Sequence, residues 1–106
     1  MTAYTVAKMN VHDPITMREY AKQSSAFVKK HGGRYLARGG KIEWLEQTNC
    51  DSRVVIVEWP SVKAAQAFFN DPDYLQVAEL RKKASTIESL NIQEGINYVD
   101  EPQLGV

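Results

Sequence analysis

Residues 53–59 read RVVIVEW, and this stretch decides the fold because it is apolar on both of its faces. Successive side chains of a strand point to opposite faces of the sheet, so Val54 and Ile56 face one way and Val55 and Val57 the other. A strand of this kind needs apolar cover on both faces. We therefore expect a central strand, with helices on one side of its sheet and a second apolar layer on the other.

The residues before this stretch predict a strand and then a helix. Residues 4–11 alternate imperfectly and are rich in β-forming residues, which indicates a strand. Asp13 can cap the following helix, and Pro14 suits its first position, because the amide hydrogen that proline lacks would have no partner there. Gly32 or Gly33 then supplies the left-handed residue that ends the helix.

The residues after this stretch predict two helices and a last strand. Pro60 ends the central strand, and Ser61 can cap a short helix. A break at residues 70–72 starts a second helix, with Asp71 as its cap. Residues 86–94 alternate again and indicate the final strand.

The order of these elements predicts a ferredoxin-like α+β domain. With residues 34–46 as the second strand, interrupted at Gly39-Gly40, the order is βαββαβ, which forms a four-stranded antiparallel sheet. We expect one domain over residues 1–96 and a C-terminal tail over residues 97–106. Because the helices cover one face only, the other would expose a large apolar patch, so we expect a homodimer packed sheet to sheet.

The charge balance argues against several classes of partner. Thirteen basic and thirteen acidic residues cancel, so no field of one sign would steer the chain onto nucleic acid or an anionic membrane. The longest apolar run, residues 54–57, is too short to span a bilayer. The N-terminus lacks a secretory pattern, and the single cysteine, Cys50, cannot form an internal disulfide. These features predict a cytoplasmic protein.

Glu58 is a carboxylate inside an apolar strand, and it needs a partner because an unpaired buried charge is costly. A regular hairpin that turns near Asn49 would place Gly40 opposite Glu58 and Arg38 diagonally from it, on the same face. Arg38 is therefore the first candidate, and Arg53, on the opposite face by parity, is the second. Arg38 and Glu58 could line a pocket, with Arg38 holding an anionic or carbonyl group and Glu58 acting as acid or base. They could equally form a structural ion pair.

Five other polar residues are candidates for a site. His31 could act as a general acid or base, or serve only as a cation at a helix C-terminus. Tyr20 lies in the apolar stripe of the first helix and either belongs to the core or points its hydroxyl into a cavity. Tyr74 and Arg81 stand two helical turns apart and share a face, as ligand-binding residues or as structural ones. Asn10, on the first strand, is a possible polar lining residue.

Motifs for nucleotide, metal or triad chemistry are missing from the sequence. It contains no GxGxxG, no GxxxxGK[ST] and no GxSxG. The two histidines have no nearby cysteine or HxxxH pattern that would suggest zinc. A phosphate-binding loop leads into a helix N-terminus, whereas Gly32-Gly33 follows a helix, so we interpret the paired glycines as architectural. Gly39-Gly40 would be a bulge in the strand or a point of close backbone approach. We expect neither a cofactor nor a metal.

Several motifs, taken in order along the chain, resemble a known family. They are HGGRYLARGG at 31–40, LE at 45–46, RVVIVEWPS at 53–61, DPDY at 71–74 and Arg81. On these motifs, residues 3–96 resemble DUF1330, a family of unknown function. The resemblance implies a dimeric α+β barrel, in which the sheets of two ferredoxin-like protomers face each other.

The resemblance leaves the activity open, because a shared fold does not choose among functions. The wider superfamily includes small cofactor-independent monooxygenases, lactone isomerases, haem-handling enzymes and stress-response proteins. One interpretation is an enzyme with acid–base or cofactor-independent oxygen chemistry, carried by His31, Arg38, Glu58 and Tyr20. The other is a non-catalytic dimer that binds a small molecule or serves in a stress response.

Overall fold

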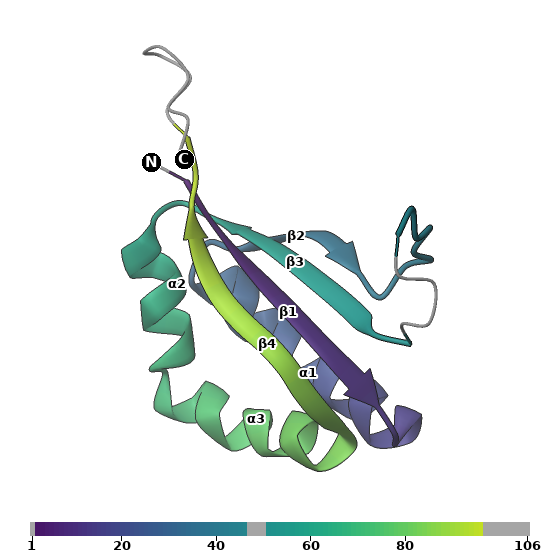
Figure 1. The fold of residues 1–106 in the computed structure, drawn as a ribbon. Coiled ribbons are helices and arrows are strands. Elements are labelled where there is room, and N and C mark those ends of the chain that lie inside the picture. Colours follow the sequence, from purple (N-terminus) through teal and green to yellow (C-terminus); the bar gives the residue numbers. More distant parts are fainter. Residues whose placement is uncertain (1, 47–50, 97–106) are drawn as a thin grey trace.

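A four-stranded antiparallel sheet with helices on one face makes up the computed structural model of this chain (Figure 1). The structure describes residues 2–46 and 51–96. The elements are β1 (Ala3–Val11), α1 (Pro14–Lys30), β2 (Arg34–Arg38), β3 (Arg53–Trp59), α2 (Val62–Phe69), α3 (Pro72–Ala84) and β4 (Ser85–Glu94). Cys50 and the predicted tail at residues 97–106 lie outside the described residues.

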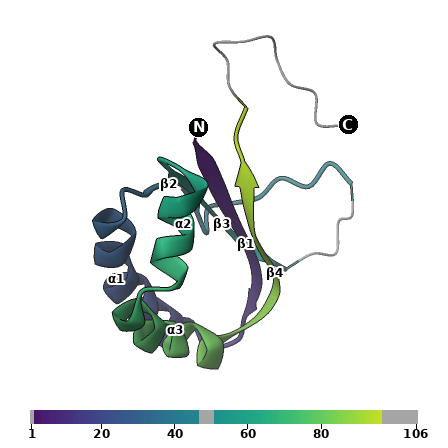
Figure 2. The same ribbon diagram turned by 90° about the vertical axis from the view of Figure 1, so that its left-hand side faces the viewer.

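The strands lie in the order β2-β3-β1-β4, and each neighbouring pair is antiparallel. The helices gather on one side of this sheet, as Figure 2 shows. This arrangement is the ferredoxin-like α+β fold predicted from the sequence, with β1 and β3 in the centre. Two helices, α2 and α3, connect β3 to β4, as the break at residues 70–72 predicts.

The predicted helix ends are confirmed by their capping hydrogen bonds. Asp13 accepts a bond from the amide of Thr16 at 3.1 Å, and Ser61 accepts one from the amide of Ala64 at 3.0 Å. Helix α1 ends at Lys30, and the chain then turns through Gly32 at φ +80°, a conformation that favours glycine. These local signals position the ends of the helices against the sheet.

The core lies between the helices and the sheet and is dominated by aromatic rings. Trp59 is 1% exposed, and its indole nitrogen donates to the Thr5 hydroxyl at 2.9 Å. The ring of Phe68 packs between Trp59 and Tyr74, with centroid distances of 4.9 and 4.0 Å. These rings also form part of the wall of a small cavity that extends along the sheet toward α1 and the start of β3.

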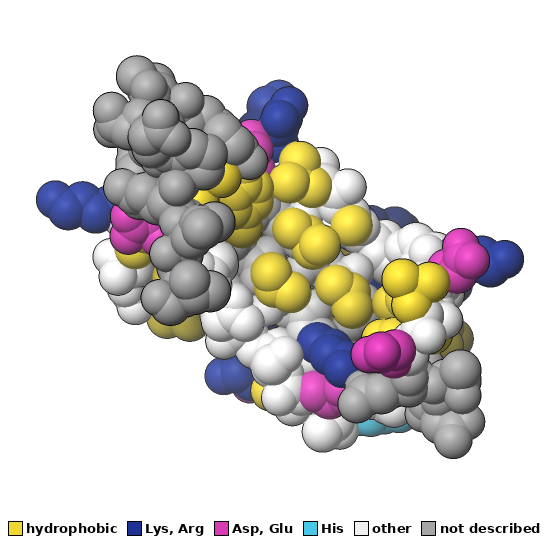
Figure 3. All heavy atoms as spheres, turned by 45° about the horizontal axis from the view of Figure 1, so that its top comes forward, with side chains coloured by type: hydrophobic (Ala, Val, Ile, Leu, Met, Phe, Trp, Pro, Cys, Tyr) yellow, Lys and Arg dark blue, Asp and Glu magenta, His cyan; other side chains and the backbone are white. Residues whose placement is uncertain are grey.

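The described helices leave the other face of the sheet uncovered. Val6 and Ile56 are cross-strand partners in the two central strands, and both point to this face, because their neighbours Thr5 and Val57 are buried beneath the helices. Hydrophobic side chains gather on this side of the molecule in Figure 3. The prediction that the RVVIVEW strand presents apolar side chains to both faces is therefore confirmed.

Two predictions about the second strand are wrong. Strand β2 ends at Arg38, and residues 39–46 are irregular rather than a continued strand. The register shift lies between Tyr35 and Ala37, not at the glycine pair. Gly39 instead adopts a φ of +68°, which turns the chain away from the sheet. The described parts of the connection to β3, residues 39–46 and 51–52, are therefore not strand, and the predicted turn at Asn49 lies outside the described residues.

Candidate functional site

A cavity of about 60 Å³ lies between the helices and the sheet. Most of its walls are apolar, from Met9 and Met17 at one end to Phe69 at the other. Among the residues that the structure describes, no Asp, Glu or His lines it. The polar side chains around it come from five different elements: Thr5, Tyr20, Ser24, Tyr35, Arg38, Arg53, Tyr74 and Arg81.

Two tyrosines from different helices meet at the cavity. The hydroxyl oxygens of Tyr20 on α1 and Tyr74 on α3 are 2.7 Å apart, and their rings meet edge to face at 6.4 Å. Burial, and then the neighbouring Tyr74, raises the pKa of Tyr20, against the opposing effect of the Arg81 charge. Tyr20 therefore stays neutral across the ordinary pH range and can donate a hydrogen bond, but it is a poor base.

Arg38 lies across the rim of the cavity. Its guanidinium donates to the carbonyl oxygen of Ala21 at 2.6 Å and covers the ring of Tyr35 at 4.1 Å. These contacts tie the end of β2 to the middle of α1, and they hold the positive charge beside the opening.

Arg53, the first residue of β3, is the second arginine of the cavity. Its Nε atom is buried and has no hydrogen-bond partner among the described residues. The guanidinium passes beside Gly39, where a Cβ atom would lie 2.5 Å from Nη1. Arg53 also borders an open groove of about 550 Å³ between the first turns of α1 and residues 39–44 and 51–53.

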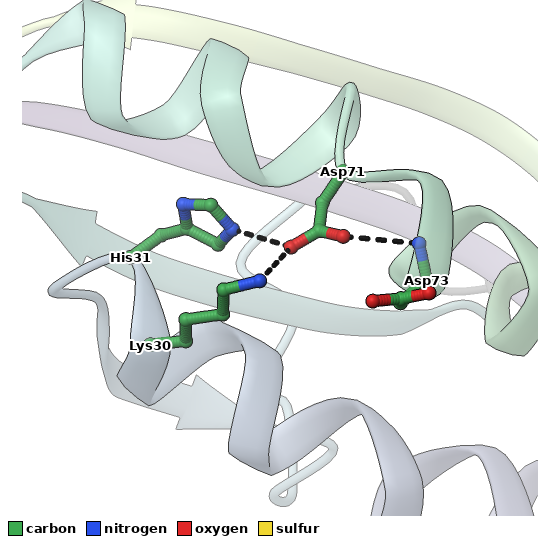
Figure 4. Close-up of polar contacts among 4 residues, drawn as sticks. All are labelled: Lys30, His31, Asp71 and Asp73. Carbon is green, nitrogen blue, oxygen red and sulfur yellow. Dashed lines mark hydrogen bonds and ion pairs between the residues drawn. The ribbon is translucent and has the colours of Figure 1, made fainter.

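His31 lies in a separate cluster at the end of α1 (Figure 4). Its Nε2 atom is 2.8 Å from Oδ2 of Asp71, and Lys30 donates to the same oxygen at 2.8 Å. The other carboxylate oxygen of Asp71 accepts a hydrogen bond from the amide of Asp73 at 3.0 Å. Asp71 therefore caps α3, as predicted. Bonds from Lys30 and then His31 lower the pKa of Asp71 below its usual range, although burial opposes them.

The predicted pair of Arg38 and Glu58 is not formed. Glu58 lies opposite Arg34 in the sheet and accepts a bond from its Nε at 2.9 Å, on the face away from the cavity. Arg38 lies opposite Val55 and turns toward α1 instead. The prediction placed Gly40 opposite Glu58, whereas Arg34, six residues earlier, lies there. The irregularity between Tyr35 and Ala37 accounts for one residue of this difference, and the irregular segment after Arg38 accounts for the rest.

The sequence-predicted residues thus fall into three places. Tyr20, Arg38, Tyr74 and Arg81 meet at the cavity. His31 belongs to the Asp71 cluster, while Glu58 and the exposed Asn10 lie on the uncovered face of the sheet. Arg53 is the cavity residue that sequence reasoning considered only as a partner of Glu58. The sequence did indicate its side of the sheet, because residues 53, 55 and 57 of a strand point to the same face, which here is the helix side.

Possible metal ligands do not cluster in the part of the chain that the structure describes. Within residues 2–46 and 51–96, no group of three or more His, Cys, Asp or Glu side chains is arranged to hold a metal ion. None of the described helices is long and apolar enough to cross a membrane.

Residues 2–95 match the family model DUF1330, described as a domain of unknown function. The chain belongs to the DUF1330 family. The predicted resemblance is therefore confirmed over nearly the whole sequence. None of the curated proteins matches the chain.

Solved structures with the same fold place this DUF1330 protein among small α+β proteins. RPA0582 from Rhodopseudomonas palustris, a protein of unknown function, matches with a TM-score of 0.71 and 17% identity over 91% of this chain and 83% of that one. SnoaB from Streptomyces nogalater, a cofactor-independent oxygenase, matches with a TM-score of 0.66 and 19% identity over 94% and 98%. At these identities the likeness shows the fold alone.

Proposed function

We propose that this protein is a homodimeric small-molecule enzyme that activates an acidic organic substrate, with oxygen chemistry of the cofactor-independent kind. The observation that carries the proposal is the Tyr20–Tyr74 hydroxyl pair in an apolar cavity beside Arg81 and Arg38. The fold shared with SnoaB, a cofactor-independent oxygenase, supports the choice of reaction class by analogy.

The chemistry follows from where the hydrogen-bond donors lie. A neutral Tyr20 can donate to a carbonyl or phenolic oxygen of a substrate, and the arginine charges stabilise the negative charge that develops there. Such donors favour the enolate or phenolate form of the substrate. The proton of the acidic substrate goes to solvent water. The electron-rich anion can then pass one electron to molecular oxygen, and the resulting substrate radical and superoxide combine to a peroxide without a metal or a flavin.

The homodimer is supported by the uncovered face of the sheet. Val6, Val54 and Ile56 lie together on this face, and Leu36 beside them is 50% exposed. A second copy placed sheet to sheet would bury this surface on both protomers. Sedimentation should give a dimer for the wild type and a monomer for Ile56→Lys. Leu75→Lys, which changes an exposed leucine on α3, is the matched control and should remain dimeric.

A direct test of the enzyme is oxygen consumption with a cyclic 1,3-diketone and a naphthol as probes. Wild-type protein should consume oxygen faster than buffer alone, and Tyr20→Phe should lower the rate at least about tenfold by removing one donor. Tyr4→Phe, on the other face of the sheet, should leave the rate unchanged. A wild type that consumes no oxygen with either probe, or a Tyr20→Phe variant as fast as the wild type, would contradict the proposal.

The alternative is a non-catalytic protein that binds a small molecule. The observation in its favour is that none of the carboxylates and histidines in residues 2–46 and 51–96 lines the cavity, where one could remove a proton from the substrate. In that case a probe should raise the melting temperature without any oxygen being consumed.

A further inference from the structure

Arg53 has a buried hydrogen-bond donor, Nε, without an acceptor among the described residues. A buried polar atom without a partner is rare in folded proteins, because its lost hydration is not replaced. The Nε atom of Arg53 is such an atom among the described residues, whereas the nearby Arg38 is already engaged by the Ala21 carbonyl and the Tyr35 ring. In the described part of the chain, the buried donor without a partner is therefore Nε of Arg53.

The position of Arg53 joins two spaces. Arg53, Met17 and Ala21 line both the inner cavity of about 60 Å³ and the outer groove of about 550 Å³. The inner cavity is too small for a metabolite, but the groove has the size of a small-molecule site, which is roughly 300–1,000 Å³. A ligand that occupies the groove therefore lies beside Arg53, whose side chain also borders the cavity with the tyrosines.

The charges around Arg53 favour an anion. Within the described part of the chain, three arginines and no acidic side chain line the inner cavity. The groove adds Arg18 and a single carboxylate, Asp51, so positive charge still exceeds negative charge. A planar guanidinium binds a carboxylate through two parallel hydrogen bonds, which a neutral group of the same shape cannot match.

The remaining walls of the groove favour an apolar body. Val11, Pro14 and Met17 form one side, and Ile42 and Trp44 from the loop after β2 form the other. An aromatic or aliphatic ring in contact with these side chains would be removed from water.

We propose that Arg53 anchors the substrate, and that this substrate is an organic carboxylate whose apolar body lies in the groove between α1 and residues 39–44. The proposal rests on the proposed function, because it places the substrate of the same cavity. Arg53 then holds the carboxylate at the junction, and the reacting end of the molecule points inward to Tyr20 and Tyr74.

The test compares 2-naphthoate with 2-naphthamide, which has the same ring system without the charge, by calorimetric titration of the dimer. Wild type should bind the carboxylate at least about tenfold more tightly than the amide, because a charge-assisted pair is stronger than a neutral one. Arg53→Gln should lose this preference and leave amide binding unchanged. Lys63→Gln removes an exposed positive charge on α2 and should change neither affinity more than about twofold.

Melting temperatures show whether a loss of binding in the Arg53→Gln variant comes from a loss of folding. Arg53→Gln should melt no lower than the wild type, because it removes a buried unpaired group. If it does not fold, Arg53→Lys replaces it and should weaken carboxylate binding while keeping the charge. Equal affinity of the wild type for naphthoate and naphthamide, or full naphthoate affinity in the Arg53 variant, overturns the proposal.

The two proposals fail separately. Carboxylate binding through Arg53 without oxygen consumption would contradict the oxygenase function and leave the anchor in place. If the protein consumes oxygen but binds 2-naphthoate and 2-naphthamide equally well, the oxygenase function stands and the Arg53 anchor is contradicted.

Discussion

The Asp71 cluster and the tyrosine–arginine cavity contrast in how far their polar groups are satisfied. Asp71, 4% exposed in its side chain, receives bonds from Lys30, His31 and the amide of Asp73. The cavity keeps a buried Arg53 donor without a partner among the described residues. Satisfied polar groups add to stability, whereas an unsatisfied one at a cavity suggests a place for a ligand. The histidine that looks catalytic in the sequence thus lies in the cluster with the complete set of partners.

The largest effect on stability is expected for Asp71→Asn. The asparagine can still cap α3, but it loses the charge that binds Lys30 and His31, so the melting temperature should fall by about 10 °C. Asp13→Asn is the matched control, because Asp13 caps α1 and no described cation pairs with it. Its loss should be much smaller. Equal losses in the two variants, measured at one protein concentration, would mean that the cluster adds nothing beyond a cap.

The Asp71 cluster should also make the free energy of unfolding depend on pH in the acidic range. The pKa of Asp71 is lowered on folding from an ordinary value of 3.8, so the unfolded chain takes up protons more readily. Its contribution is complete above about pH 5 and declines as the pH falls through 3.8 toward the lower folded value. Urea unfolding between pH 6 and pH 3 should therefore show wild type and Asp71→Asn converging at low pH. A constant difference over this range would rule out the ionised pair.

The tyrosine pair should give a smaller, coupled effect. Tyr20→Phe and Tyr74→Phe each leave one hydroxyl without its partner and should each cost about 1 kcal/mol of unfolding free energy. The double variant should cost little more than either single one, because no unpaired hydroxyl remains. Urea unfolding of the four proteins measures this coupling, with Tyr4→Phe as the control on the other face. Strictly additive losses would show that the 2.7 Å contact contributes nothing.

The smallest effect concerns the partner of Glu58. A double-mutant cycle of Arg34→Gln and Glu58→Gln should give a coupling of about 0.2–1 kcal/mol, as for other exposed ion pairs. The same cycle with Arg38→Gln should give none, because Arg38 turns to the carbonyl of Ala21. A coupling between Arg38 and Glu58 that exceeds that of Arg34 would restore the register assumed from the sequence.

The sequence was a good guide wherever the signal is local. Asp13, Ser61 and Asp71 cap helices within three residues of themselves, so their patterns are visible along the chain. The order of the elements and the apolar character of β3 then follow. The family resemblance also rests on short motifs and is confirmed over residues 2–95.

The predictions failed where contacts between segments distant in the sequence determine the structure. The register of β2 depends on an irregularity near Leu36 and on how the loop after Arg38 leaves the sheet, neither of which any alternation predicts. The bonds from Lys30 and His31 to Asp71 join residues about forty positions apart, so a cap could be predicted from the sequence but its cations could not. Arg53 had the correct parity, but its lack of a partner is a property of the packed structure.

Gly39 has a consequence for how this site can be altered. A side chain at that position would meet the terminal nitrogen of Arg53 and would also have to adopt a φ of +68°. Since a guanidinium is the movable end of a long side chain, it would move aside before the backbone of β3 did. Gly39→Ala therefore offers a way to shift the position of a charge without removing it. The residue at position 39 therefore controls, by its size alone, where the charge of Arg53 lies.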